Sequence, residues 1–460
     1  MAEVGDRPRF RFAPDAVWLI GAVLALGYLL PARTVVPGLG AAGRPALLLG
    51  FACLLLWLLL RLTPGMFTPN LNPLRVLLLL FVCSYLVSYA VAYARGPTPE
   101  VALGADRSAL HWAGLIGVFL VTLDGLRSRD RLHSLLRILL LLGVAMGVVG
   151  LLQFILHIDL TDNMIPPGLT TNGDLINIGD ERGAGYRRVA STSGHYIEFG
   201  VLMAALTPLG LHFTLHGETG IRRTLAAAAT GLLAFASLAS VSRSAILALA
   251  VAAIAMLPAW TLRTVFNLSV LGMGFIVGVS AVQPGLLGTF RSLFSSVDSD
   301  PSIAGRTDDY AIATELIFER PWFGQGINSV PADELLLDNQ WLGLLIWNGM
   351  VGTLMLATLI LGAALLGWSI GRRGTDPVAR HLGYAIVAPI AAITATFLTY
   401  DTLWFGATAV TFFVLLGCAG ALWRIERPPG RSRWWAAILA IPPTAADIRP
   451  AATPARPVKP

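Results

Sequence analysis

Residues 305–352 read GRTDDYAIATELIFERPWFGQGINSVPADELLLDNQWLGLLIWNGMVG, and the rest of the chain is organised around them. The segment is too polar to span a bilayer and too apolar to predict disorder. Apolar side chains recur at helical spacing over 310–317, which predicts an amphipathic helix. Pro321 ends that helix, and the glycines that follow it permit a tight turn. Asp338 and Asn339 then precede a new apolar run, a position suited to a helix N-cap.

The composition of the chain is that of an integral membrane protein. Hydrophobic residues make up 55% of the 460 residues and charged residues only 13%, and the mean hydropathy is +0.69. The net charge of +6 does not indicate nucleic-acid binding, because the basic residues are distributed by side of the membrane. The three cysteines lie in apolar runs and predict neither a disulfide framework nor a metal site.

Apolar runs long enough to cross a bilayer recur along the chain. A spanning helix needs roughly 20 apolar residues. The sequence therefore predicts an all-α integral membrane protein with about 12 transmembrane helices and a large extracytoplasmic loop that contains short helices. The predicted spans are 13–31, 46–62, 74–94, 108–124, 133–157, 194–215, 222–240, 242–258, 264–283, 339–370, 378–399 and 402–423.

Arginine is concentrated in the short connections on one side of these predicted helices. Cytoplasmic connections are enriched in basic residues, so this distribution predicts cytoplasmic termini and a multi-pass protein of the cytoplasmic (inner or plasma) membrane. The first apolar run has no small-residue cleavage site after it, and we interpret it as a retained span.

The predicted spans divide the chain into membrane parts and loops, and loops as long as the two outer ones are uncommon without a function. The parts are an N-terminal five-helix membrane part (1–157), a first outer loop (158–193), membrane helices six to nine (194–283), a large extracytoplasmic loop (284–338), membrane helices ten to twelve (339–424) and a disordered cytoplasmic tail (425–460).

Three arginines lie on the outer side, against the usual bias. Arg188 precedes the sixth span, Arg243 lies in the turn between the seventh and eighth, and Arg306 begins the loop helix. The guanidinium group stays charged and offers several donors, which suits it to phosphate. The alternative is that each arginine pairs with a nearby acid. For Arg243 that alternative is weaker, because its immediate neighbours include no carboxylate.

Carboxylate and imidazole groups on the same side are candidates for proton transfer and substrate binding. Asp338 is a candidate general base, with capping of the helix that follows as its alternative role. His195 and Glu198 share one helical face, as substrate-binding groups or as the polar rim of a capped helix end. These two residues do not complete a zinc site. For Asp401 we expect a buried side chain that pairs with an arginine.

Four of these segments, in this order, resemble the O-antigen ligase and polymerase superfamily of membrane glycosyltransferases. Each is degenerate by itself, but all four lie in register on the same predicted side of the membrane. The matching segments are RVASTSGHYIEFG (188–200), SRSA (242–245), GRTDDYAIATELIFERPWFGQG (305–326) and LDNQWLGLLIWNGMVG (337–352).

The resemblance implies a many-helix bundle that transfers glycans from a polyprenyl diphosphate, such as undecaprenyl diphosphate, to an acceptor hydroxyl. Arg243 and Arg306 correspond to the arginines that hold the diphosphate in the family, and Arg188 to a third basic position. The family's ligases usually place a histidine where this chain has Asp338. This departure suits a branch that polymerises or transfers a different glycan.

These expectations together describe an inverting, metal-independent glycosyltransferase at the outer face of the membrane. Two guanidinium groups would stabilise the diphosphate leaving group without a metal or cofactor. Asp338 would be the catalytic base, and His195, Glu198 and Asn339 are candidate substrate-binding residues. The expected partners are a polyprenyl-diphosphate-linked glycan donor, a glycan or lipid acceptor and the membrane, with no nucleic acid.

Two other classes of protein fit the same pattern of spans. A transporter or flippase of lipid-linked sugars would place ionisable groups near the bilayer midplane and interrupt helices in paired halves. A non-catalytic envelope scaffold would retain the fold without catalysing a reaction. The aspartate at 338, in place of the family's usual histidine, leaves this alternative open. The sequence does not distinguish a ligase from a polymerase.

Overall fold

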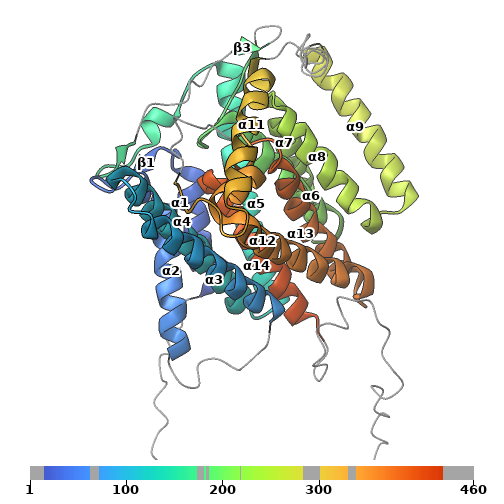
Figure 1. The fold of residues 1–460 in the computed structure, drawn as a ribbon. Coiled ribbons are helices and arrows are strands. Elements are labelled where there is room, and N and C mark those ends of the chain that lie inside the picture. The colour runs from blue at the N-terminus through green and yellow to red at the C-terminus, as the bar shows by residue number, and fades with distance from the viewer. Residues whose placement is uncertain are drawn as a thin grey trace, which may run out of the picture.

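The computed structural model is almost entirely helical, and it describes residues 15–62, 72–172, 181–182, 186–217, 219–282, 288, 301–329 and 338–427 (Figure 1). Each of the predicted spans coincides with a helix, and α11 is the predicted loop helix. The helices are α1 (Ala16–Leu29), α2 (Pro45–Leu62), α3 (Pro73–Ala94), α4 (Pro99–Gly125), α5 (Arg129–Leu156), α6 (Tyr196–His212), α7 (Gly220–Ala239), α8 (Arg243–Met256), α9 (Leu262–Val282), α11 (Pro301–Glu319), α12 (Gln340–Arg373), α13 (Pro377–Thr396) and α14 (Gly406–Ile425).

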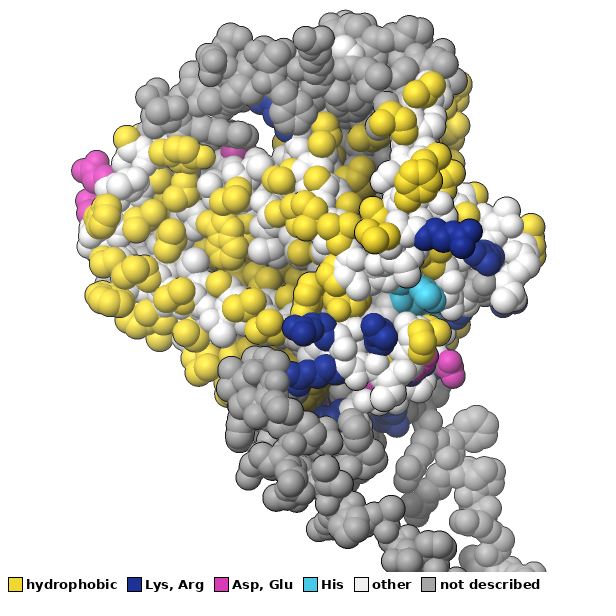
Figure 2. All heavy atoms as spheres, turned by 90° about the vertical axis from the view of Figure 1, so that its right-hand side faces the viewer, with side chains coloured by type: hydrophobic (Ala, Val, Ile, Leu, Met, Phe, Trp, Pro, Cys, Tyr) yellow, Lys and Arg dark blue, Asp and Glu magenta, His cyan; other side chains and the backbone are white. Residues whose placement is uncertain are grey.

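The length and surface of these helices are those of a membrane bundle. Within the described ranges, nine helices are long and apolar enough to cross a bilayer, and α1 and α8 are shorter apolar helices. Figure 2 shows hydrophobic side chains over most of the described part of one side face, with basic side chains mainly in its lower part. The predicted class, an all-α integral membrane protein, is confirmed.

One end of the bundle, the basic end, is held by ion pairs between helix termini. Asp124, at the end of α4, accepts hydrogen bonds from Trp57 Nε1 (2.9 Å) and Arg61 Nη2 (3.1 Å) of α2, and it also pairs with Arg75 of α3. Arg129 at the start of α5 pairs with Glu426 just after α14 at 2.8 Å. These contacts bring together connections that the arginine distribution assigns to the same side.

The opposite end, the loop end, carries the strands and α11. Strand β1 (Thr34–Val35), between α1 and α2, pairs with β2 (Thr170–Thr171) from the first predicted loop. Strands β3 (Glu181–Arg182) and β4 (Tyr186–Arg187) form a second pair in that loop. The connection between α1 and α2 and the loop 158–193 therefore lie at the same end, as the sequence predicts.

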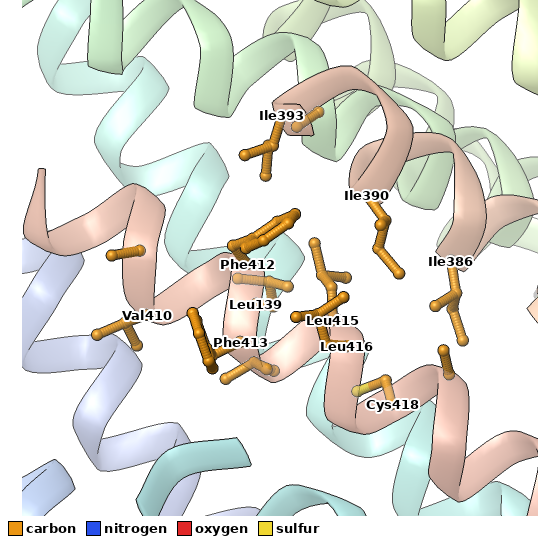
Figure 3. Close-up of a cluster of buried hydrophobic side chains, with 14 of the residues drawn as sticks. Leu139, Ile386, Ile390, Ile393, Val410, Phe412, Phe413, Leu415, Leu416 and Cys418 are labelled. Atoms are coloured by element: carbon orange, nitrogen blue, oxygen red, sulfur yellow. The ribbon is translucent and has the colours of Figure 1, made fainter. Parts of the chain in front are cut away.

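Helix α14 forms the centre of the bundle and is buried along almost its whole length. Figure 3 shows its side chains packed against those of α5 and α13; the labelled residues are Leu139, Ile386, Ile390, Ile393, Val410, Phe412, Phe413, Leu415, Leu416 and Cys418. The N-cap residue Phe405 provides no side-chain acceptor. Glu198 of α6 does so instead, because its Oε1 accepts from the backbone N–H of Ala407 and Thr408, both at 3.1 Å.

Helix α12 is broken at Gly349, which has φ 65° and ψ −172°. Its 34 residues would extend about 51 Å as one straight helix, well beyond a hydrocarbon core of about 30 Å. The predicted span 339–370 corresponds to α12, but it is not one continuous membrane-spanning helix, because it is broken at Gly349. A short helical segment at the loop end precedes the break, and the membrane-spanning part follows it.

The turn after α11 inserts into this break and replaces the lost helical hydrogen bonds. Met350 N–H donates to the carbonyl of Pro321 (2.7 Å) and Val351 N–H to that of Trp322 (3.1 Å), while Gln325 N–H donates to the carbonyl of Ile346 (2.6 Å). Buried backbone groups must be paired in a membrane. The 321–325 turn and the break in α12 thus stabilise each other.

One predicted boundary changes, and two predicted parts are incompletely described. Helix α4 begins at Pro99 rather than near 108, because Thr98 caps it and proline suits the first helical position. The tail 425–460 lies outside the described residues beyond 427, and so does much of the loop 284–338.

Replacing Gly349 by alanine should destabilise the protein. A Cβ at this position would overlap the carbonyl of Trp322, and the positive φ is unfavourable for alanine. We expect a loss of about 1–3 kcal/mol, measured as a lower thermal midpoint in detergent. Gly231→Ala in α7 is the matched control, because nothing lies within 4 Å of a Cβ there. Equal midpoints for the two variants would contradict the assigned role of the break.

Replacing Glu198 by glutamine should also lower the thermal midpoint. Besides capping α14, the carboxylate accepts from Gly194 N–H at 2.8 Å, and an amide NH₂ would face one of these donors. Loss of hydrogen bonds to a buried charged group costs about 1.5–3 kcal/mol. Glu100→Gln, on an exposed first turn of α4, should leave the midpoint unchanged. A stability loss no larger than that of the control would rule out the capping role.

Candidate functional site

The loop end brings together the starts of α6, α8 and α12 and the turn between α13 and α14. The ring of His195, just before α6, lies 6.1 Å from that of Phe405, just before α14. Gln340 N–H, at the start of α12, donates to the carbonyl of Phe397 at 2.8 Å. A Cβ on Gly200 would overlap Ser240, so α6 also packs closely against the turn that leads into α8.

Asp338 and Asn339 have different roles at the start of α12. The cap is Asn339, whose Oδ1 accepts from the backbone N–H of Trp341 (3.0 Å) and Leu342 (3.3 Å). Helix capping by Asp338, the alternative role, is therefore wrong. The Asp338 side chain is exposed at the loop end, and Asn339 uses its oxygen for the helix rather than for a ligand.

Asp401 lies next to this helix start, in the turn between α13 and α14. Its Oδ1 would be 3.8 Å from a Cβ on Gly343, in the first turn of α12. Among the described residues, this buried oxygen has no hydrogen-bond partner. Burial, together with the negative charge of Asp338, raises the pKa of Asp401 from 3.8 to about 7. This Oδ1 oxygen has no arginine partner among the described side chains. The expected pairing with an arginine stays a prediction, because the side chain of Arg306 lies outside them.

Arg188 is buried beside α6, with 7% of its surface exposed. Its guanidinium lies 4.3 Å from the centre of the Tyr196 ring and donates to the Tyr196 hydroxyl. Stacking on an aromatic face orients the planar group while its charge is kept. The structure thus places a fixed positive charge where the sequence predicts one.

His195 and Glu198 begin α6 but differ in access. His195 is the N-cap, and its Nδ1 accepts from Ile197 N–H at 3.2 Å. Its ring stacks on Tyr196 with centres 3.9 Å apart and is half-buried. Glu198 is fully buried and already accepts three backbone hydrogen bonds. The arrangement leaves the His195 ring nearer to a ligand than the Glu198 carboxylate.

The remaining two arginines are placed by their helices. Arg243 is the first residue of α8, after Ser242 as N-cap and after Val241 with φ 48°. Its side chain is half-buried at the loop end. Arg306 lies on α11, but its side chain is outside the described part of the structure. Convergence of Arg243 and Arg306 on one diphosphate therefore stays a prediction.

Sequence reasoning missed the polar side chains that surround Asp401. They are single polar residues inside or beside apolar runs, and each contacts the backbone of the turn from a different helix. These residues could have been found from the sequence, because Asp401 is an acidic residue between two apolar spans on the loop side and other isolated polar residues also lie near the ends of spans. The missed residues are Arg44, His111 and Gln340.

The described side chains do not form a group of three or more His, Cys, Asp or Glu able to hold a metal ion. The chemistry available at the loop end is that of buried or partly buried arginines, an imidazole and two neighbouring carboxylates. Such a set can bind a polyanion and accept a proton.

Comparison with known proteins agrees with this arrangement. Residues 228–357 match the family model described as O-Antigen ligase. The match begins in α7 and ends in α12, so it contains Arg243, α11 with Arg306, Asp338 and the break at Gly349. A search of curated proteins finds no match. Through this segment the predicted resemblance to the O-antigen ligase family is confirmed.

Proposed function

We propose that the protein is an inverting, metal-independent glycosyltransferase that uses a polyprenyl-diphosphate-linked glycan as donor. The observation that carries the proposal is that the segment matching the O-antigen ligase family holds Arg243, Arg306 and Asp338 at the loop end. In the proposed orientation the loop end faces outward from the cytoplasmic membrane and both termini are cytoplasmic. The acceptor is a hydroxyl group of a glycan or lipid.

The donor diphosphate would be bound by arginines. Arg243 and Arg306 would hold its oxygens, and Arg188, fixed on Tyr196, would add charge at the same end. Guanidinium groups bind phosphate through paired hydrogen bonds and remain charged. As the sugar–phosphate bond breaks, negative charge grows on the leaving diphosphate, and prepositioned arginines stabilise that charge most in the transition state.

The acceptor hydroxyl would lose its proton to the Asp338–Asp401 pair. A general base works best when its pKa lies near the working pH. Asp401 meets that condition because its pKa is raised to about 7. Asp338, exposed just before α12, would contact the acceptor, and Asp401 would take up the proton. Attack from the side opposite the diphosphate inverts the anomeric carbon.

A transporter or flippase of lipid-linked sugars is the second candidate, and one observation favours it. Discontinuous helices are common at the binding sites of transporters, and α12 is broken at Gly349. The described residues show no equivalent break in a paired half of the chain. Reconstituted protein that moves a labelled lipid-linked sugar across vesicles without forming a glycosidic bond would favour this candidate over the enzyme.

Replacing Arg243 or Arg306 by alanine should reduce glycan transfer by about 10²-fold, the usual cost of removing a donor to a developing negative charge. Arg243→Lys should recover only part of the activity, because lysine lacks the paired donors. The measurement is product formed by purified protein from a polyprenyl-diphosphate-linked glycan, with surface glycan in cells as a second readout. Arg263→Ala, exposed at the start of α9, is the control. Normal transfer by both alanine variants at normal abundance would end the proposal.

Replacing Asp401 by asparagine should remove a pH-dependent part of stability. The folded-state pKa lies above the ordinary value of 3.8, so the contribution is fully present below that value and is lost as pH rises through about 7. We expect the thermal midpoint of the wild type to fall between about pH 4 and about pH 7 and to level off above that range, and Asp401→Asn to lack that decrease. Parallel curves for the two proteins would show that Asp401 does not titrate in this range.

A further inference from the structure

The turn over residues 397–405, which carries Asp401, is held by side chains from other helices. His111 Nε2 of α4 donates to the carbonyl of Leu403 at 2.8 Å, and the His111 ring stacks on Trp404 with centres 5.7 Å apart. Arg44, just before α2, donates to the carbonyl of Trp404 at 3.2 Å. A loop without buried partners would move freely, whereas this turn is fixed from several sides.

Gln340 is the contact that joins this turn to the start of α12. Its backbone N–H donates to the carbonyl of Phe397 at 2.8 Å, and its Oε1 accepts from the backbone N–H of Leu403 at 2.7 Å. The side chain is almost completely buried. Gln340 therefore binds the turn on both sides of Asp401, while it stands two residues after Asp338.

This double attachment holds Asp401 against the first turn of α12, where the negative charge of Asp338 acts on it. Two like charges held close together favour a state in which one of them is protonated. If the turn were free, Asp401 would move away from Asp338 and into water. The hydrogen bonds of Gln340 oppose that movement, because breaking them leaves the buried N–H of Leu403 unpaired.

We propose that Gln340 is a positioning residue that holds Asp401 against the start of α12, within reach of the charge of Asp338, and thereby sets the pH at which Asp401 releases its proton. A role of Gln340 in catalysis rests on the proposed glycan transfer, whereas its effect on the position of Asp401 does not. The titratable groups that face the turn are Asp338 from the start of α12, Arg44 before α2, His111 of α4, Glu198 of α6 and Tyr400 of the turn itself.

Two substitutions of Gln340 should move the titration of Asp401 in opposite directions. Gln340→Leu removes the acceptor for Leu403 N–H but keeps the backbone bond to Phe397. The part of the turn between Asp401 and Leu403 therefore loosens, Asp401 becomes more hydrated, and its transition should shift down by about one pH unit. Gln340→Glu keeps the acceptor and adds a negative charge, so the transition should shift up. The readout is the thermal midpoint between about pH 5 and pH 9, with the transition of Asp401 defined by comparison with Asp401→Asn.

Gln153→Leu is the matched control. Gln153 is also buried, and its Oε1 likewise accepts a backbone N–H, from Ser191 at 2.8 Å, but it lies at the end of α5. This control should lose a similar amount of stability and leave the transition where it is in the wild type. If Gln340→Leu behaves like the control, or if the transition persists in Asp401→Asn, the proposal is overturned.

The pH-titration experiment still tests the proposal if one of the Gln340 variants fails to fold. Should Gln340→Leu not fold, the upward shift in Gln340→Glu decides, and no shift overturns the proposal. With active protein, the pH profile of glycan transfer should move in the same direction as the stability transition. A wild type that transfers no glycan but shows both shifts would end the proposed function and leave the positioning role intact.

Discussion

The structure depends on an exchange of backbone hydrogen bonds between the 321–325 turn and the break in α12. A membrane helix that stops at Gly349 leaves polar groups unpaired, and lipid offers them no partner. Pro321, Trp322 and Gln325 provide those partners. Arg95 of α3 in turn donates to the carbonyl of Gln325. The first segment of α12 is thereby held at the loop end, where it presents Asp338.

A second set of polar contacts, around the start of α14, serves both the fold and the site. Most of the bundle is apolar and packs without direction, so the few buried hydrogen bonds decide how the helix ends meet. Glu198 caps the central helix from α6, and Gln340 ties α12 to the same region. Buried polar atoms are almost always paired. The Oδ1 atom of Asp401 is one of several exceptions among the described residues and the one carboxylate oxygen among them, which makes it a candidate for a functional role.

Sequence reasoning predicted the elements that depend on local pattern and missed those that depend on distant contacts. Apolar length placed the spans, and Pro321 with the glycines after it placed the end of α11 and the turn. The break at Gly349 lies inside an apolar run that reads as one long helix, and only the inserted turn makes it stable. The N-cap of α12 is Asn339 rather than Asp338. Asparagine and aspartate are both favoured at an N-cap, so the sequence did not distinguish these two neighbours. The environment of Asp401 includes Asp338, which is 63 positions away in the sequence, and the turn of Asp401 is held by Gln340, His111 and Arg44 from other parts of the chain.

A paired carboxylate gives a physical reason why an aspartate can stand where the related ligases usually have a histidine. An isolated aspartate has a pKa near 3.9 and is a weak base at neutral pH, whereas an imidazole titrates near 6.5. A second carboxylate, Asp401, has a pKa raised to about 7, first by burial and then by the charge of Asp338. In the proposed reaction, the two aspartates therefore supply the proton affinity that one imidazole would have supplied. The substitution at 338 is then compatible with catalysis only because the turn at 401 is rigid.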